Sequence, residues 1–311
     1  MTGVGIGVAM ATYNGERYLR PQLDSILDQQ RKPDRVEIVD DGSTDGTLPI
    51  LEDYAGRHPG LIRVTRNRMN RGAPHTFAKA MARCGTRYIA LADQDDEWLP
   101  EKLAVLSAAA AEHPDAGMWF HDLSIINPVG EIRAESFWAV APAIETLPVT
   151  GAAARARIAS YSNPVPGCTM FIDTDLLSAI LPIPNAAVGH DWWISAVCFF
   201  LGAPRAVARP LGRYRLHPHQ VAGIGTRLER RPDEKLRLPV HRKLLREIGR
   251  LWDRRRTLKA HEQRRRLEQR AKINALLMLL DRALADGAAP ERAAEYRRLR
   301  GEIAARSEAR P

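Results

Sequence analysis

Cysteine is scarce in this 311-residue chain, and the three that are present do not pair in sequence. Cys84, Cys168 and Cys198 are too few and too scattered for a disulfide framework, and none has the C-x-x-C spacing of a zinc site. We therefore expect buried thiols in a reducing compartment. No apolar run is long enough for a membrane span, and the first residues lack the basic and apolar regions of a secretory signal. These absences predict a cytoplasmic protein.

Several common phosphate-binding and nucleophile motifs are also missing. The chain has no G-x-x-x-x-G-K-[ST] loop, and its Gly3 to Gly7 stretch lies before and within the first predicted strand, where a dinucleotide motif would follow a strand. It has no G-x-S-x-G elbow for a serine nucleophile. A phosphate group must therefore be held by a metal ion and by basic side chains.

Positive charge is concentrated at one end of the chain. Residues 233–311 contain 22 Lys and Arg against 12 Asp and Glu, whereas residues 1–232 contain 24 against 25. Apolar residues recur at helical spacing among these cations from Leu244 to Leu284. The pattern predicts a basic amphipathic helical region over residues 231–311. It fits a hairpin packed on the rest of the protein or a contact with an anionic membrane face, and the lack of interleaved aromatic residues argues against nucleic acid.

Short apolar runs alternate with helix-period segments in the first half of the chain, which is typical of an α/β fold with a Rossmann-like, mostly parallel central sheet. We expect strands at Val4–Ala11, Arg35–Val39, Leu61–Thr65, Tyr88–Ala92, Met118–His121 and Cys168–Ile172. Flanking helices are expected at Tyr18–Gln30, Leu48–Arg57, His75–Cys84, Glu101–Glu112 and His190–Leu201. The stretch from Asn127 to Pro166 is less periodic. We assign residues 1–230 to one α/β domain.

Polar residues follow the first two predicted strands. The first strand ends in Ala11-Thr12-Tyr13-Asn14-Gly15, and the second ends in Asp40-Asp41-Gly42-Ser43-Thr44-Asp45-Gly46-Thr47. The carboxyl ends of the strands form the ligand crevice of an open α/β sheet. Tyr13 is suited there to stack on a base, and Asp41 is suited to accept the N3–H of a uracil or thymine. The alternative is turn and capping chemistry, with Ser43 or Thr44 opening the next helix.

Three carboxylates follow another apolar strand, Tyr88–Ala92, and reach the same edge of the sheet. These are Asp93, Asp95 and Asp96. Like charges so close repel one another unless a cation lies among them, and oxygen ligands suit Mg²⁺ or Mn²⁺. Such an ion would bridge a diphosphate and neutralise its charge as it leaves. The alternative is an acidic cap for the helix that starts near Pro100.

In their order along the chain, these motifs resemble family 2 glycosyltransferases of the GT-A fold, close to a bacterial rhamnosyltransferase-like branch. The resemblance covers roughly residues 4–225. Besides the strand ends above, it rests on Asp93 to Leu103, Gly167-Cys168-Thr169-Met170, His190-Asp191-Trp192-Trp193 and Tyr214-Arg215-Leu216-His217. It implies an inverting transferase that uses a nucleotide-diphospho-sugar.

The resemblance also implies roles for particular residues around the donor. Thr12, Tyr13, Asn14 and Asp41 bind the nucleotide, and the ribose and the metal are served by Asp93, Asp95 and Asp96. It leaves open which of Asp95 and Asp96 is the principal metal ligand.

The resemblance places the catalytic base at Asp191, which would remove the acceptor hydroxyl's proton as that hydroxyl attacks. The alternative for this residue is an ordinary helix cap. Trp192 or Trp193 is a candidate platform for the acceptor sugar, although at least one indole in a helix is expected to pack in the core.

A basic segment after the last predicted strand is the remaining candidate. It contains Arg213, Arg215, His217 and His219. We expect a loop in which Arg215 binds the diphosphate and His217 binds a phosphate oxygen or completes the metal shell. The alternative is a solvated basic turn.

The sequence thus predicts an inverting, metal-dependent glycosyltransferase that uses Mn²⁺ or Mg²⁺ and a dTDP- or UDP-linked sugar, with rhamnose favoured by resemblance only. The expected acceptor is a saccharide or lipid-linked hydroxyl in cell-surface polysaccharide synthesis. The expected location is the cytoplasm or the inner face of the cell membrane. One alternative is a nucleotidyltransferase, which would carry a Gly-rich basic loop where this chain has Tyr13 to Arg17. Another is a non-catalytic polysaccharide- or membrane-binding module, against which Asp95, Asp96 and Asp191 argue.

Overall fold

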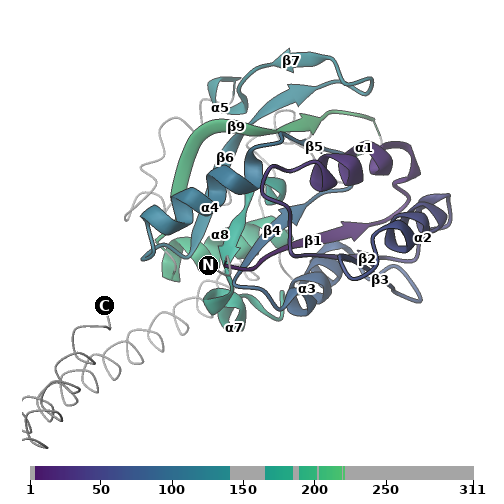
Figure 1. Cartoon of the computed structure of the whole chain (residues 1–311), viewed down its shortest axis with the longest axis horizontal. Helices are drawn as coiled ribbons and strands as arrows, with labels where there is room; N and C mark the ends of the chain where they lie inside the picture. Colours follow the sequence, from purple (N-terminus) through teal and green to yellow (C-terminus); the bar gives the residue numbers. More distant parts are fainter. Residues whose placement is uncertain (1–3, 141–164, 185–188, 202, 219, 221–311) are drawn as a thin grey trace, which may run out of the picture. The chain divides into compact units, whose positions relative to one another are not determined.

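The computed structural model describes residues 4–140, 165–184, 189–201, 203–218 and 220 (Figure 1). The predicted basic helices of residues 231–311 and His219 lie outside this part, as does most of the less periodic stretch before Pro166. None of the helices in the described part is both long and apolar enough to span a bilayer.

One mixed sheet organises these residues, in the order β3-β2-β1-β4-β8-β6-β9-β5, with β7 beside β6 (Figure 1). The strands are β1 (Ile6–Thr12), β2 (Arg35–Asp40), β3 (Ile62–Arg66), β4 (Tyr88–Ala92), β5 (Glu97–Trp98), β6 (Met118–Ile126), β7 (Ile132–Ala134), β8 (Phe171–Asp173) and β9 (Arg205–Arg215). Strands β3, β2, β1 and β4 pair in parallel, as expected from the βα pattern. Strand β8 runs antiparallel to both β4 and β6, so the second half of the sheet is mixed.

Helices precede or follow most of the strands. They are α1 (Glu16–Leu27), α2 (Thr47–Arg57), α3 (Ala73–Cys84), α4 (Lys102–Glu112), α5 (Phe137–Val140), α7 (Leu177–Ile180) and α8 (His190–Leu201). Two 3-10 turns, η1 (Gly167–Thr169) and η2 (Thr174–Leu176), flank β8. All five predicted helices are present, and the α/β class is confirmed.

The alternation of side chains along β1 explains how helices pack on both faces of the sheet. Ile6, Val8 and Met10 belong to the main hydrophobic cluster, together with the apolar faces of α1 and α2. The intervening Gly7 faces α3, because a Cβ there would lie 2.9 Å from the Cβ of Cys84. The missing side chain therefore lets α3 pack closely against the strand.

The parallel register brings three strand ends to one edge of the sheet. Thr12, the last residue of β1, pairs with Asp40, the last residue of β2. Ala92, which ends β4, pairs with Met10 on the other side of β1. The polar segments after Thr12, Asp40 and Ala92 therefore lie side by side, as the sequence predicted.

Candidate active site

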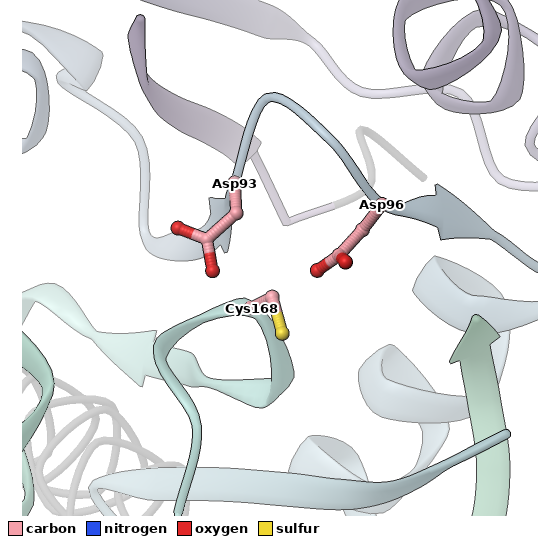
Figure 2. Close-up of side chains that lie close together, drawn as sticks. All are labelled: Asp93, Asp96 and Cys168. Carbon is pink, nitrogen blue, oxygen red and sulfur yellow. The ribbon is translucent and has the colours of Figure 1, made fainter. Parts of the chain in front are cut away.

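The segment Asp93-Gln94-Asp95-Asp96, here called the acidic turn, connects β4 to β5. Figure 2 shows the side chains of Asp93, Asp96 and Cys168 close together, with the Asp96 carboxylate directed toward the other two. One ligand atom from each of these three residues lies within 4.8 Å of the others. The structure thus brings together two of the predicted carboxylates and one thiol that the sequence had assigned only to the interior.

The acidic turn holds more negative charge than its surroundings accommodate. Burial, and after it the nearby charge of Asp95, raises the pKa of Asp96 to about 7. Burial and the charges of Asp96, Asp95 and Asp191 raise the pKa of Asp93 well above its ordinary value. A cation bound at this turn would relieve the repulsion.

The buried Lys102 supplies one positive charge beneath the turn. Its Nζ donates a hydrogen bond of 2.7 Å to the carbonyl oxygen of Cys168 and lies 3.8 Å from the centre of the Trp98 ring. Burial lowers the pKa of Lys102 to about 8. The alternative role of the acids as a helix cap is wrong, because β5 separates them from α4, whose N-cap residue is Glu101.

His217, which follows β9, contacts the acidic turn although it is 122 positions from Asp95 in sequence. Its Nε2 lies 2.9 Å from Oδ2 of Asp95. The ring of His217 also packs against the ring of Tyr18, with 4.7 Å between the centroids. The structure therefore places His217 beside one of the two predicted metal ligands, Asp95.

Arg213 and Arg215 lie within β9, so the expected basic loop is wrong for these two residues. The side chain of Arg215 is only 4% exposed and pairs with Glu97. Its Nε donates to the carbonyl oxygen of Asp95 at 2.9 Å, and its backbone N–H donates to Oδ1 of Asp96 at 3.1 Å. Arg215 fastens the acidic turn to β9, so the expectation that it binds a diphosphate does not fit this geometry.

Thr12 and Asn14 tie the first polar segment to the second. The Thr12 hydroxyl donates to Oδ1 of Asp40 at 3.2 Å. Asn14, in the left-handed region with φ of 48°, accepts the backbone N–H of Thr44 on its Oδ1 at 2.8 Å. The Tyr13 side chain between them is 40% exposed at the edge of the sheet. Tyr13 therefore presents a ring to solvent, whereas its two neighbours bond within the protein.

Asp41 is buried and its carboxylate is already hydrogen bonded. It accepts the side-chain amide of Asn67 at 2.7 Å and the backbone N–H groups of Arg71 and Gly72 at 2.9 and 2.8 Å. Burial raises the pKa of Asp41, but these hydrogen bonds outweigh it and leave the pKa below its ordinary value. The alternative in which Ser43 or Thr44 opens α2 is wrong, since the N-cap residue is Gly46.

Gln94 is a residue of the acidic turn to which the sequence gave no role. Its Oε1 accepts the backbone N–H of Tyr13 at 2.8 Å, and its Nε2 donates to the Tyr13 carbonyl at 3.0 Å. A Cβ on Gly15 would lie 2.3 Å from Oε1 of Gln94, so a side chain at this position would displace the Gln94 amide. An amide among carboxylates was the available signal, because it can both donate and accept.

Asp191 lies in the first turn of α8, and this turn packs against Gly167 of η1, next to Cys168. Its charge is one of those that raise the pKa of Asp93. Its Oδ1 accepts the backbone N–H of Trp192 at 2.7 Å. A Cβ on Gly167 would lie 2.8 Å from Nε2 of His190, so the absence of a side chain there lets η1 pack against the start of α8.

Both tryptophans of α8 are core residues in this structure. Trp192 and Trp193 are each 2% exposed. The indole N–H of Trp193 donates to the carbonyl oxygen of Ile180 at 2.7 Å. This burial does not support a role for either ring as a platform for an acceptor sugar, because stacking needs an accessible ring face.

The sequence profile of Glycosyl transferase family 2 matches residues 7–173, which is more than half of the chain. The chain belongs to this family. The match spans β1 through β8, including the acidic turn, and it decides against the nucleotidyltransferase alternative. Residues 190–217, which supply Asp191 and His217, lie beyond the matched range.

Named relatives and solved structures agree with the family. The chain is 36% identical over 99 residues to the dTDP-rhamnosyl transferase RfbG of Shigella flexneri, covering 30% of this chain and 34% of the relative. It is 38% identical over 98 residues to the putative teichuronic acid biosynthesis glycosyltransferase TuaG of Bacillus subtilis, covering 32% and 38%. The chain thus spans little more than a third of the length of these relatives.

A solved structure supports the fold. The mannosyltransferase PcManGT from Pyrobaculum calidifontis, in complex with GDP-Man and Mn²⁺, superimposes with a TM-score of 0.52 at 21% identity. The superposition covers 70% of this chain and 59% of that one. The fold is therefore the GT-A fold that the sequence predicted.

Proposed function

We propose that this family 2 glycosyltransferase is an inverting, metal-dependent enzyme that transfers a sugar from a nucleotide-diphospho-sugar to a saccharide or lipid-linked hydroxyl. One observation carries the proposal. In the acidic turn after β4, Asp95 contacts His217, and the charge of Asp191 contributes to the raised pKa of Asp93. This arrangement supports the assignment of metal, donor and base roles to residues near one edge of the sheet.

The residues present fit a divalent cation of the hard type. Asp95 and His217 offer an oxygen and a nitrogen 2.9 Å apart, and both are more accessible than Asp96, which is 1% exposed. We assign Asp95 and His217 as the ligands of Mn²⁺ or Mg²⁺, with Asp96 as their buried neighbour. When bound, the ion would neutralise charge on the diphosphate. A mannosyltransferase of the same fold was solved with Mn²⁺, which supports this assignment.

The remaining roles belong to the chain's own side chains. Asp191 takes the proton of the acceptor hydroxyl as that hydroxyl attacks the sugar carbon. The exposed ring of Tyr13 stacks on the base, and Asp41 holds the segment from Asn67 to Gly72 beside it. Asp93 binds the ribose of the donor. Arg215 keeps the acidic turn in place from β9.

The relatives suggest the chemical class of the donor and the product. RfbG is a dTDP-rhamnosyl transferase, and TuaG is assigned to teichuronic acid biosynthesis. We propose dTDP-rhamnose as the first donor to test and a cell-surface polysaccharide as the product. The proposed location is the cytoplasm, with the basic residues 231–311 contacting the inner face of the membrane.

A thermal-shift screen tests the donor. The full-length protein is heated with dTDP, UDP or GDP, each with Mn²⁺ or with EDTA. A ligand that binds only the folded state raises the melting temperature. At a concentration 100 times its Kd, it increases the free energy of unfolding by about 2.7 kcal/mol. Stabilisation by dTDP with Mn²⁺, and much less in EDTA, supports the proposal. Equal stabilisation in EDTA contradicts metal dependence, and no stabilisation by any of the three nucleotides contradicts the donor class.

A further inference from the structure

The group formed by Asp93, Asp96 and Cys168 has the ligand set of a different kind of metal site from the pair Asp95 and His217. Its three ligand atoms lie within 4.8 Å of one another and come from the two ends of the acidic turn and from η1 (Figure 2). Zinc–sulfur and zinc–oxygen bonds of about 2.3 and 2.1 Å place the ligands of a tetrahedral site roughly 3.5 Å apart. Small side-chain rotations would therefore bring the three atoms onto one ion.

A second observation points to a cation at this position. Oδ1 of Asp96 accepts the backbone N–H of Arg215, whereas Oδ2 receives no well-aligned hydrogen bond from the described residues and has only the Cys168 thiol as a neighbouring donor. The Asp96 side chain is 1% exposed and is directed toward Asp93 and Cys168 (Figure 2). A buried carboxylate oxygen without a well-aligned donor is costly, and a metal ion would satisfy it.

The charges balance for a divalent ion. Two carboxylates and a thiolate carry three negative charges, and Lys102 contributes one positive charge nearby. Lys102 donates to the carbonyl oxygen of Cys168 and not to its sulfur, so the sulfur's side-chain partner is Asp96, a member of the same group. Burial and the nearby carboxylates raise the pKa of the Cys168 thiol, so metal binding must release its proton.

We propose that Asp93, Asp96 and Cys168 bind a thiophilic divalent cation such as Zn²⁺ or Cd²⁺. Sulfur in the ligand set selects such ions over Mn²⁺ and Mg²⁺, which prefer oxygen ligands. Asp93 is only half-buried, so an ion can reach the group from solvent at this residue. An ion here withdraws Asp93 from the ribose of the donor, so Zn²⁺ inhibits transfer, a consequence that rests on the proposed function.

Cadmium titration of the full-length protein, without any nucleotide-sugar, tests the site directly. A cadmium–thiolate bond has an ultraviolet charge-transfer band, which we expect to saturate at one Cd²⁺ per chain and to be absent with Mn²⁺. Cys168→Ser should remove the band and weaken Cd²⁺ binding by more than about tenfold. Cys84→Ser and Cys198→Ser, which change the other two cysteines, should retain the band.

Circular dichroism and thermal unfolding establish that each variant is folded. If Cys168→Ser does not fold, the Cys84→Ser, Cys198→Ser double variant leaves Cys168 as the only thiol and must retain the band. Asp96→Asn should weaken Cd²⁺ binding without removing the cadmium–thiolate band. A folded wild-type protein without the band, or an unchanged band in folded Cys168→Ser, overturns the inference and leaves the proposed function intact. A retained band without nucleotide binding overturns the proposed function alone.

Discussion

Nε2 of His217 lies 2.9 Å from Oδ2 of Asp95, although the two residues are 122 positions apart. The contact joins the turn after β4 to the segment that follows β9. Tyr18 of α1 also packs against the imidazole, with 4.7 Å between the ring centroids. The proposed metal ligands are therefore held by three separate elements, and this arrangement can be tested from each of them.

Removal of the His217 imidazole should weaken Mn²⁺ binding. If His217 and Asp95 share the ion, His217→Ala should raise the Kd for Mn²⁺ by about 10- to 100-fold, measured by calorimetry on the full-length protein. Asp95→Ala should do at least as much. His113→Ala is the matched control, since His113 is exposed beyond the end of α4. If His217→Ala and Asp95→Ala bind Mn²⁺ as tightly as His113→Ala and the wild-type protein do, the metal assignment is wrong.

Asp191→Asn should lower turnover and leave donor affinity almost unchanged. A general base contributes about 10²- to 10⁴-fold to the rate, and asparagine cannot take the proton. Asparagine retains the side-chain oxygen that accepts the backbone N–H of Trp192. If Asp191 only stabilises the helix start, the variant should transfer sugar at nearly the wild-type rate. Nucleotide-diphosphate affinity and transfer, measured on the same preparation, separate the two roles.

Asp122 of β6 is a poor candidate for the base. Its carboxylate accepts the backbone N–H groups of Leu123 and Trp138 at 2.8 and 3.0 Å and also the hydroxyl of Ser136. These bonds give Asp122 a structural role at the start of α5. Asp122→Asn should therefore lower stability and leave the pH dependence of transfer unchanged.

Arg215→Lys should destabilise the protein, whereas Arg213→Lys should not. The guanidinium of Arg215 bonds the carbonyl oxygens of Asp95 and Asn127 as well as Glu97, a set that one ammonium cannot satisfy. We expect a loss of about 1–3 kcal/mol in urea unfolding. Arg213 pairs with the same Glu97, but its side chain is 42% exposed, so its replacement should change stability by less than about 0.5 kcal/mol. Similar losses in both variants would contradict the fastening role.

The stability of the metal-free protein should fall as the pH rises between about 4 and 7. The pKa of Asp96 is raised to about 7 from 3.8, so in this interval the folded protein binds more protons than the unfolded chain. The slope from one group is at most about 1.4 kcal/mol per pH unit. Urea unfolding in EDTA should show a shallower slope in Asp96→Asn. An identical slope in the variant would show that Asp96 titrates normally.

The sequence predicted the edge of the sheet better than it predicted the partners of individual side chains. Asp93, Asp95 and Asp96 were placed correctly at the end of β4 because strand alternation and strand ends are local signals. Arg215 was not, since a cation's burial depends on Glu97 and on the carbonyl oxygens of a turn about 120 positions earlier.

Two further site features lacked a local signal. The indoles of Trp192 and Trp193 offered no means of telling a binding surface from a packed interior, because both need large aromatic rings. The short strand β5, which pairs with β9 through Glu97 and Trp98, is too brief for periodicity to reveal. Such features are set by tertiary pairing.

The pairing of β9 with the acidic turn has a consequence for the timing of biosynthesis. A ribosome releases Asp93 to Asp96 long before Arg215 and His217, and contacts this distant in sequence form late. A nascent chain can therefore complete β1 to β4 while its acidic turn still lacks both the strand that fastens it and the imidazole that faces Asp95. Ribosome-bound chains stopped before Arg215 should fold their parallel strands yet remain unable to bind Mn²⁺ tightly, which makes the proposed metal site one of the last features the growing chain acquires.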